Sequence, residues 1–579
     1  MMRRLVFNRY AWTLGMSGAF LVWPVHSCVA QERPAVNAVD ESHAHAVEGV
    51  HSKFMASREC ALCHSFSLRA SAMRDTKNRN VAPYDLWQGS MMAQSARDPY
   101  WKAAVSAEII HTPQQKSHIE EVCTRCHAPM VVGPRSSPEG ESLAFLKSNV
   151  DPHGLGADGV SCTVCHQISS QGLGTESSYT GGFQIGDQRI LYGPHANPVT
   201  MPMQRHVAYT PAQGTHILES ALCATCHNVI TESFRADGVA TNLHLHEQVP
   251  YLEWRNSDFS TEGEHDASKG KSCQQCHVPT VDQTGQKIST RLAHNPGGRD
   301  FPFLQPRQPI GRHTFAGGNV FMTKLLRDHR EELGIPTPAV AFDRVIDDSM
   351  QMLEHQTAQV SLSTASKQPG IGIIRVRIDN LAGHKFPTAY PSRRAWIYIE
   401  VRSSQGDVVF ASGAFDSQGR IIDLDGVPLS TEKAGGAIQP HLTRIQHSDQ
   451  VIIYETIMED EKGDVTFALL RGGRFQKDNR ILPRGWRSDH AEAQATQPQG
   501  VDGDEDFRAG GDEVSYELRL PAGTYRVEAK LVFQSLSSRY VDELFQLDTP
   551  EIRSFRKLYE KADRTPITLG RSQMTLEVR

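Results

Sequence analysis

The chain has 579 residues, of which 39% are hydrophobic and 22% charged, so it can bury more than one core and two or three domains are expected. The formal net charge is −6 at pH 7 and no long basic run appears, which argues against nucleic acid or an anionic membrane surface as the main partner. After the N-terminal stretch no segment approaches the ~20 uninterrupted apolar residues of a spanning helix. We therefore expect a soluble or lipid-tethered protein.

The N-terminal stretch is typical of an export signal. Arg3, Arg4 and Arg9 supply a positive start, an apolar run follows over residues 10–25, and small residues that suit cleavage end at Ala30. We predict a signal peptide over 1–30 and a flexible linker over 31–50. The segment around Cys28 also loosely resembles a lipoprotein cleavage box, which leaves a lipid-anchored form as the alternative.

The cysteines carry the strongest signal in the sequence. Apart from Cys28 in the leader, the ten others form five Cys-x-x-Cys pairs, and a histidine follows each pair directly. The five motifs are Cys60/Cys63 with His64, Cys123/Cys126 with His127, Cys162/Cys165 with His166, Cys223/Cys226 with His227, and Cys273/Cys276 with His277.

This spacing fits covalent attachment of haem. On one helical turn, positions i and i+3 share a face, so both thiols can meet the two vinyl groups of one porphyrin. The histidine that follows can place its imidazole under the iron. Disulfides and zinc ribbons have no need of that histidine, and five pairs cannot be divided among four-cysteine zinc sites. We predict five c-type haems, with the ten cysteines as attachment points and the five histidines as proximal iron ligands.

The pattern of the chain changes near its middle, and the sequence predicts an α+β multidomain protein. Residues 51–330 hold all the motifs and are expected to form a mainly helical or irregular pentahaem domain, with a helical connector over 331–357. Residues 358–579 alternate in the manner of an antiparallel β-sandwich with a late helix near 551–562. Expected helices in the first part are 71–75, 85–96, 99–110 and 217–225, and expected connector helices are 321–333 and 343–356. Expected strands are 358–362, 370–378, 395–402, 408–412, 451–458, 465–470, 513–520 and 523–533.

An acidic segment over 489–511 interrupts the β-rich part. Its carboxylates, Asp502, Asp504, Glu505 and Asp506, could bind calcium, although a solvated loop explains them more simply. No nucleophile, phosphate loop or metal cluster stands out in this part of the sequence. The β-rich part could therefore have a docking or structural role.

Several stretches resemble a known family. They are Asp158-Gly-Val-Ser-Cys-Thr-Val-Cys-His166, Tyr192-Gly-Pro-His195, Leu252-Glu-Trp-Arg-Asn-Ser257, Ser272-Cys-Gln-Gln-Cys-His277, His313-Thr-Phe-Ala-Gly-Gly-Asn319 and Gly383-His-Lys-Phe-Pro-Thr388. Together they resemble the bacterial multihaem c-type cytochromes related to the cytochrome c554/c-prime group, over nearly the whole chain. The resemblance implies electron transfer in the periplasm or at the cell surface of a bacterium. It also implies redox partner proteins, such as another cytochrome or a membrane quinol-linked complex.

The resemblance also implies ligands for the opposite face of the iron. In similar proteins, the histidine matching His313 and one preceding the fourth motif, here His206 or His216, are distal ligands. His384 either reaches a haem from the β-rich part or packs at the interface. Further histidines in the haem region could also serve, so the sequence alone does not assign partners: His51, His111, His118, His153, His195, His244, His246, His265 and His294.

One departure from the family pattern concerns the first haem. Related sequences often read Trp-x-x-Ser-x-His-Ala after the first motif, whereas this chain has Met92 where that histidine would be. A thioether ligand raises the reduction potential relative to a second histidine. The hypothesis is that Met92, or its neighbour Met91, ligates the first haem, and the alternative is that both simply pack on the porphyrin.

A multihaem oxidoreductase with one open-coordinate haem, acting on a small nitrogen or sulfur compound, is the alternative function. Such an enzyme needs an exchangeable position on one iron and nearby acid or base groups. A motif that ends in lysine is a frequent sign of such an iron, and all five motifs here end in histidine. This favours a non-catalytic electron carrier.

Overall fold

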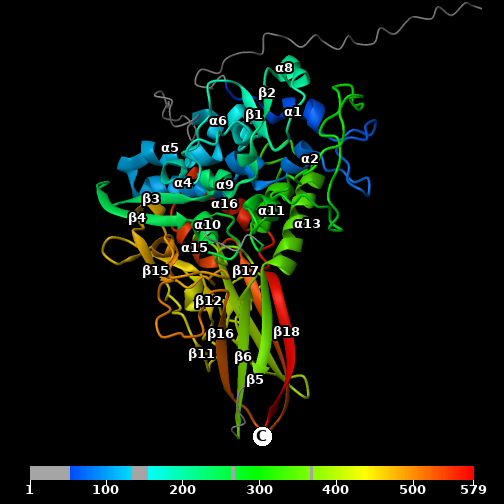
Figure 1. Cartoon of the computed structure of the whole chain (residues 1–579). Coiled ribbons are helices and arrows are strands. Elements are labelled where there is room, and N and C mark those ends of the chain that lie inside the picture. The colour runs from blue at the N-terminus through cyan, green and yellow to red at the C-terminus, as the bar shows by residue number, and fades with distance from the viewer. Residues whose placement is uncertain (1–52, 133–153, 263–267, 365–368) are drawn as a thin grey trace, which may run out of the picture. The chain divides into compact units, whose positions relative to one another are not determined.

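The computed structural model describes residues 53–132, 154–262, 268–364 and 369–579. The expected signal peptide and linker, together with His51, His153 and His265, lie outside the described residues. The chain divides into Met1–Glu48 and one compact unit, Gly49–Arg579, and the description below concerns that unit. Within the described ranges, no helix combines the length and apolar character needed to span a bilayer. The mixed α+β class predicted from the sequence is confirmed: helices dominate up to residue 357 and sheets dominate after it (Figure 1).

Each motif forms a short helix, as the i, i+3 spacing predicts. The motif helices are α1 (Ser57–His64), α5 (Lys116–His127), α7 (Cys162–Cys165), α9 (Ser220–His227) and α11 (Cys273–His277). α11 begins with a capping box, in which the Ser272 hydroxyl accepts the Gln275 N–H and the Gln275 side chain accepts the Ser272 N–H. The remaining helices of this part are α2 (Pro83–Trp87), α3 (Met91–Gln94), α4 (Pro99–His111), α6 (Pro129–Val132), α8 (Met201–Val207), α10 (Pro250–Arg255), α12 (Val320–Asp328) and α13 (Ala339–Gln356).

The helix expected over 85–96 is broken into two, and a close backbone contact explains the break. Gly89 lies between α2 and α3, and a Cβ atom there would meet the Ala341 carbonyl oxygen of α13 at 2.3 Å. Ser90 then caps α3 by accepting the Ala93 N–H. The chain therefore turns at the point where α13 presses against its backbone.

Two other predictions for this part are wrong. Residues 71–75 form turns rather than a helix, because Met73 adopts a left-handed φ of 57° and its N–H donates to the Arg291 carbonyl. The motif region also contains more strand than its sequence suggests. β1 (Ile190–Gly193) pairs with β2 (Thr210–Gln213), and β3 (Val229–Phe234) forms a hairpin with β4 (Ala240–Gln248).

Two sheets pack together in the β-rich part. One has the order β11 (Arg444–Ile445), β16 (Gly511–Arg519), β6 (Ile371–Asn380), β5 (Ala358–Thr364). The other has the order β12 (Ile453–Tyr454), β7 (Arg394–Ser403), β17 (Gly523–Gln534), β18 (Ile567–Val578), with β8 (Val408–Ser412) also on β7. Buried residues alternate along β6 and β16, as strands with one covered face require. Most predicted strands are confirmed, but over 465–470 only Val465–Thr466 is a strand and a 3-10 turn follows over Leu469–Arg471. The β11–β16 pair is parallel and β18 was not expected.

Smaller elements complete this part. They are β9 (Ala414–Phe415), β10 (Ile421–Ile422), β13 (Thr456–Glu459), β14 (Val465–Thr466), β15 (Arg474–Asp478), α14 (Ala493–Thr496), α15 (Ser538–Leu544) and α16 (Pro550–Tyr559). The late helix predicted near 551–562 is α16. It packs against α4 of the motif region, where the rings of Phe555 and Tyr100 lie 5.4 Å apart.

The motif region and the β-rich part share a hydrophobic core. One cluster of buried side chains contains Trp101 and Ile119 from the first and Ile397 and Phe555 from the second. The carboxylate of Glu108 on α4 also accepts the backbone N–H groups of η8 (Leu469–Arg471), from Leu469 at 2.7 Å and from Leu470 at 3.2 Å. The two parts are therefore packed together through both apolar and polar contacts.

Replacing Ile397 by alanine is expected to lower the free energy of unfolding by about 2–5 kcal/mol, because its fully buried side chain leaves a cavity in this core. Val408→Ala on the adjacent strand β8 is the matched control, since that side chain is 41% exposed and its loss should change stability by about 0.5 kcal/mol or less. Denaturant titration followed by tryptophan fluorescence measures both. Equal effects of the two substitutions would contradict the packing described for β7.

Candidate functional site

A single cavity of about 1970 Å³ runs through the motif region, and all ten motif cysteines and all five motif histidines line it. Pockets for one small ligand usually measure about 300–1,000 Å³, so this cavity exceeds the largest of them about twofold. Most of its other lining side chains are apolar or aromatic, for example Trp254 and Phe259. The residues present therefore fit several large, flat, apolar cofactors held side by side.

The motif helices are neighbours within this cavity. Thiols of different motifs lie close enough to shift each other's pKa, and the pairs are Cys60 with Cys162, Cys126 with Cys226, and Cys223 with Cys273. Val164 of α7 packs in one cluster with Leu222 and Cys226 of α9, which connects the third motif to the fourth. Every motif thus adjoins another, so groups attached to these thiols would be closely spaced.

The motif histidines are oriented for ligation. In four of the five, the Nδ1 atom faces a backbone carbonyl oxygen: His64 faces Leu292 at 2.9 Å, His166 faces Tyr192 at 2.6 Å, His277 faces Ala316 at 2.6 Å and His127 faces Ser95 at 3.4 Å. An Nδ1–H that donates to a carbonyl leaves Nε2 as the free ligand atom, the usual arrangement around metal-bound histidines. Burial lowers the pKa of His127 and of His227 to about 4, so both imidazoles are neutral near pH 7 and available to a metal.

Two motif histidines face a second imidazole. The ring centres of His166 and His313 are 6.4 Å apart, and so are those of His277 and His384. With metal–nitrogen bonds of about 2 Å, two imidazoles on opposite sides of one iron have ring centres roughly 6 Å apart. The Nδ1 atom of His384 lies 2.8 Å from the Lys385 carbonyl oxygen, which again leaves Nε2 free. Both pairs therefore have the spacing of an iron held by two histidines.

The structure places the remaining predicted ligands less decisively. Met91 and Met92 begin α3, are half-buried and line the cavity. His206 lies on α8 and also lines it, although its side chain is exposed. His216 is buried in η6 (Thr215–Leu218), with its Nε2 atom 2.8 Å from the Ile168 carbonyl oxygen. Ligation by these residues stays a prediction.

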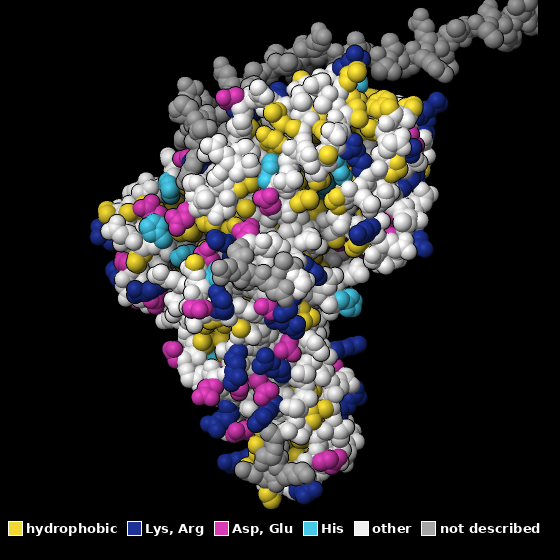
Figure 2. Space-filling model, in the orientation of Figure 1, with side chains coloured by type: hydrophobic (Ala, Val, Ile, Leu, Met, Phe, Trp, Pro, Cys, Tyr) yellow, Lys and Arg dark blue, Asp and Glu magenta, His cyan; other side chains and the backbone are white. Residues whose placement is uncertain are grey.

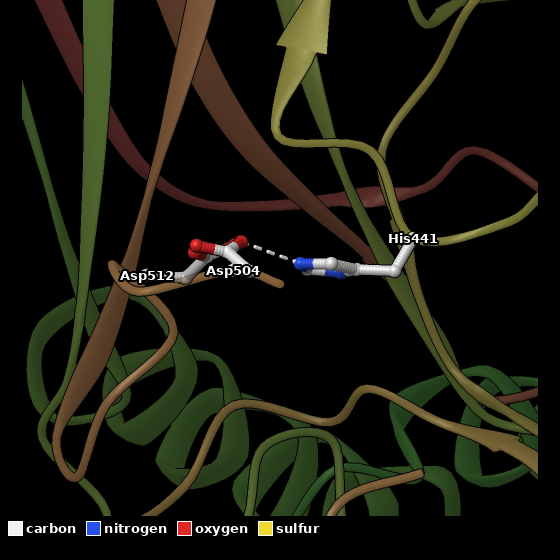
Figure 3. Close-up of side chains that lie close together, drawn as sticks. All are labelled: His441, Asp504 and Asp512. Atoms are coloured by element: carbon white, nitrogen blue, oxygen red, sulfur yellow. Dashed lines mark hydrogen bonds and ion pairs between the residues drawn. The ribbon is translucent and has the colours of Figure 1, made fainter. Parts of the chain in front are cut away.

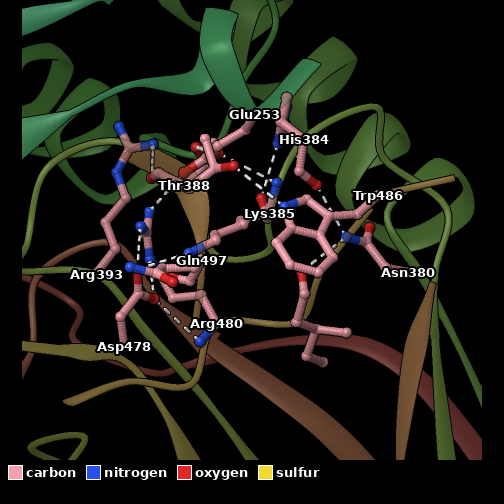
Figure 4. Close-up of polar contacts among 12 residues, drawn as sticks. Glu253, Asn380, His384, Lys385, Thr388, Arg393, Asp478, Arg480, Trp486 and Gln497 are labelled. Atoms are coloured by element: carbon pink, nitrogen blue, oxygen red, sulfur yellow. Dashed lines mark hydrogen bonds and ion pairs between the residues drawn. The ribbon is translucent and has the colours of Figure 1, made fainter. Parts of the chain in front are cut away.

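A buried charge network, which was not predicted from the sequence, supports the His384 loop (Figure 4). Lys385 Nζ lies 2.7 Å from Asp478 Oδ2, and Arg480 bridges Asp478 at 2.8 Å and Glu253 Oε1 at 3.0 Å. Glu253 comes from α10, so these charges join the motif region to the β-rich part. The only sequence signal was the presence of charged residues inside two family-like stretches, those that contain Glu253 and Lys385.

Two buried carboxylates also line the cavity. Burial raises the pKa of Glu108 and that of Glu247 to about 7 in each case. Glu247 accepts a hydrogen bond from the Thr231 hydroxyl at 2.7 Å. Both groups can therefore exchange a proton near neutral pH.

One further group of potential metal ligands occurs among the described residues: His441, Asp504 and Asp512 (Figure 3). His441 Nε2 lies 2.7 Å from Asp504 Oδ2. Asn479 Nδ2 approaches His441 Nδ1 at 3.1 Å and also donates to the Ile453 carbonyl, so Nδ1 accepts and Nε2 carries the proton given to Asp504. Neither ring nitrogen of His441 is free to bind a metal, because both already take part in hydrogen bonds. The group is therefore a hydrogen-bonded structural cluster.

This arrangement also bears on calcium. Of the four loop carboxylates, Asp504 alone joins the group, whereas Asp502, Glu505 and Asp506 are exposed. Calcium takes about 6–8 oxygen ligands, which one histidine and two aspartates do not provide. The side chains in this group do not fit a calcium site.

Comparison with known proteins supports the haem assignment. Residues 222–297, which contain the fourth and fifth motifs, match the family model for cytochrome c554 and c-prime. No curated protein matches the chain. The crystal structure of a penta-heme cytochrome c552 from Thermochromatium tepidum is similar to this structure over 90% of this chain and 99% of that chain, with 16% sequence identity and a TM-score of 0.47. The family match covers the fourth and fifth motifs, and all five motifs have the Cys-x-x-Cys-His form to which c-type haem is attached.

Replacing His384 by alanine removes the imidazole opposite His277, so we expect one haem to change from low-spin to high-spin. His294→Ala is the matched control, because both ring nitrogens of His294 already face carbonyl oxygens, of Asn295 at 2.7 Å and of Ser65 at 2.9 Å. Electron paramagnetic resonance of the oxidised protein counts high-spin iron in each variant. An unchanged spectrum for His384→Ala would rule out its role as a ligand.

Proposed function

We propose that this chain is a multihaem c-type cytochrome that carries five covalently bound haems and transfers electrons between redox partners in the periplasm or at the cell surface of a bacterium. The observation that carries the proposal is that all five complete motifs line one cavity. Each haem iron, when bound, takes up and gives up one electron. The chain's own residues hold the haems, exclude water from them and adjust their potentials.

The surroundings of the irons favour electron transfer over catalysis. Two motif histidines, His166 and His277, have a second imidazole at the spacing of a six-coordinate iron. Such an iron has no position left for a substrate, and its ligands need not change when it gains or loses an electron. The adjoining motifs also allow electrons to pass between haems without leaving the protein.

The cavity reaches the surface of the motif region. Leu62, Val199 and Leu218 line it and are also 48%, 39% and 41% exposed. Apolar side chains are visible over this part of the molecule, whereas charged side chains dominate the β-rich part in the same view (Figure 2). We infer that partners, such as another cytochrome or a membrane quinol-linked complex, exchange electrons at this apolar surface.

A multihaem oxidoreductase remains the second candidate, and the second motif favours it. The ring of His127 stacks on Trp101, with ring centres 4.6 Å apart and planes inclined by 2°. Among the described residues, the ring contact of His127 is therefore with an indole, whereas His166 and His277 each face a second imidazole. The titratable carboxylates Glu108 and Glu247 line the same cavity, and an enzyme needs such groups to move protons. An open iron at this motif would make the chain a catalyst.

A redox titration followed by absorbance and electron paramagnetic resonance separates the two candidates. Electron transfer predicts five one-electron steps, low-spin iron throughout, and no spectral change with nitrite, hydroxylamine or carbon monoxide. A high-spin signal that disappears when nitrite is added would instead establish an open iron. Fewer than five electrons taken up by fully loaded protein would contradict the haem count.

The Met92→His variant is expected to lower one of the five midpoint potentials, because histidine replaces the thioether that favours ferrous iron. Met203→His is the control, since Met203 also lines the cavity but lies on α8. Spectroelectrochemistry measures both variants. If all five potentials keep their values in Met92→His, the methionine packs on the porphyrin and does not ligate it.

A further inference from the structure

The buried charges around the His384 loop do not balance. Figure 4 shows three cations, Lys385, Arg393 and Arg480, close to two anions, Glu253 and Asp478. Lys385 and Arg480 use both anions in the ion pairs described above. One positive charge is left over, and it belongs to Arg393.

Arg393 has little to offset its charge. Among the described residues, its polar contact is a hydrogen bond from Nη1 to the Thr388 carbonyl oxygen at 3.1 Å. Burial lowers the pKa of Arg393 to about 10, and no carboxylate acts against that shift, so the guanidinium is charged and unpaired near pH 7. A guanidinium has five N–H donors, and most of those on Arg393 are free to face a ligand.

The neighbouring Arg394, in contrast, has a full set of hydrogen-bond partners. Arg394 donates to both oxygens of Glu432 at 2.7 Å and to Gln534 at 2.9 Å. It is buried away from the cavity, whereas Arg393 lines it. The two neighbouring arginines therefore have different surroundings, and of the two only Arg393 lines the cavity.

We propose that Arg393 is an anion-binding residue of the cavity and that its partner is a haem propionate. This rests on the proposed function, since it requires a haem near Arg393. The planar fork of a guanidinium matches a carboxylate through two parallel hydrogen bonds. A propionate is the carboxylate that a bound haem brings to this space, and one propionate would balance the leftover charge.

The position of Arg393 indicates which haems are concerned. Burial is the main cause that lowers the pKa of His227 and that of His384, and the charge of Arg393 lowers both further, which places Arg393 close to the fourth motif and to the imidazole opposite His277. Gly318 borders the guanidinium, since a Cβ atom there would lie 3.8 Å from Nη1. The propionate therefore comes from the haem at the fourth or the fifth motif.

The Arg393→Leu variant tests this in the full-length, haem-loaded protein. Loss of the positive charge leaves the propionate unpaired, so ferric iron becomes more stable. We expect one midpoint potential to fall and to become dependent on pH near neutrality, because the propionate then titrates. Arg393→Lys keeps the charge without the fork and should give a smaller shift in the same direction.

Controls separate this result from general damage and from the proposed function. Arg394→Leu should destabilise folding but leave all five potentials unchanged, because its charge belongs to Glu432. If Arg393→Leu binds five haems, accepts five electrons and shows five unchanged, pH-independent potentials, the propionate proposal is overturned while electron transfer stands. If potentials of the unaltered protein shift with added nitrite or phosphate and this response disappears in Arg393→Leu, a free oxyanion is the partner and the propionate assignment is wrong.

Discussion

An iron in a porphyrin plane takes one ligand from each face, so a histidine-ligated haem needs protein on both sides at a fixed spacing. The motif helices supply one side locally, since the attachment cysteines and the first histidine lie within one turn. The other side must come from elsewhere in the chain. His313 follows the last motif, and His384 comes from the loop after β6, each with its ring centre 6.4 Å from that of a motif histidine. The motif region and the sheets therefore have to pack closely.

This requirement explains the success and the failures of prediction. Each Cys-x-x-Cys-His motif is local, so its helix could be predicted from spacing alone, and its haem and iron ligand follow from the same spacing as predictions. The strands β6, β7 and β17 were predictable because their side chains alternate between core and solvent. β18 and the β3–β4 hairpin were not predicted, since most residues of β18 and β4 are exposed or only partly buried and show no regular burial on one face. The break at Gly89 depends on a contact with α13, more than two hundred residues away, which no local pattern reports.

The position of His384, which comes from the β-rich part, could least be predicted from the sequence. Its sequence context allowed either ligation or packing at the interface, and only the structure shows that its ring lies 6.4 Å from that of His277. The charge network beneath it was also hidden, because Glu253, Lys385 and Asp478 are far apart in the sequence. Burying such charges costs several kcal/mol per ion before pairing, so the network is weak evidence for stability. The network instead restricts geometry, because each buried charge must lie next to an oppositely charged partner. Together these ion pairs hold the loop that carries His384 in place.

These contacts change how the β-rich part is to be understood. A separate docking module would contact the motif region only through surface residues, so that removing the module would leave the fold of the motif region unchanged. Here the β-rich part contributes His384 and Arg393 to the cavity, and Glu108 of the haem region holds the backbone of η8 in return. The sheets also share one hydrophobic core with α4 and α5. Because the imidazole of His384, the charge of Arg393 and the hydrophobic core all cross the boundary, the β-rich part forms one wall of the cavity, and the potential of a haem bound beside His384 would depend on how that wall is packed.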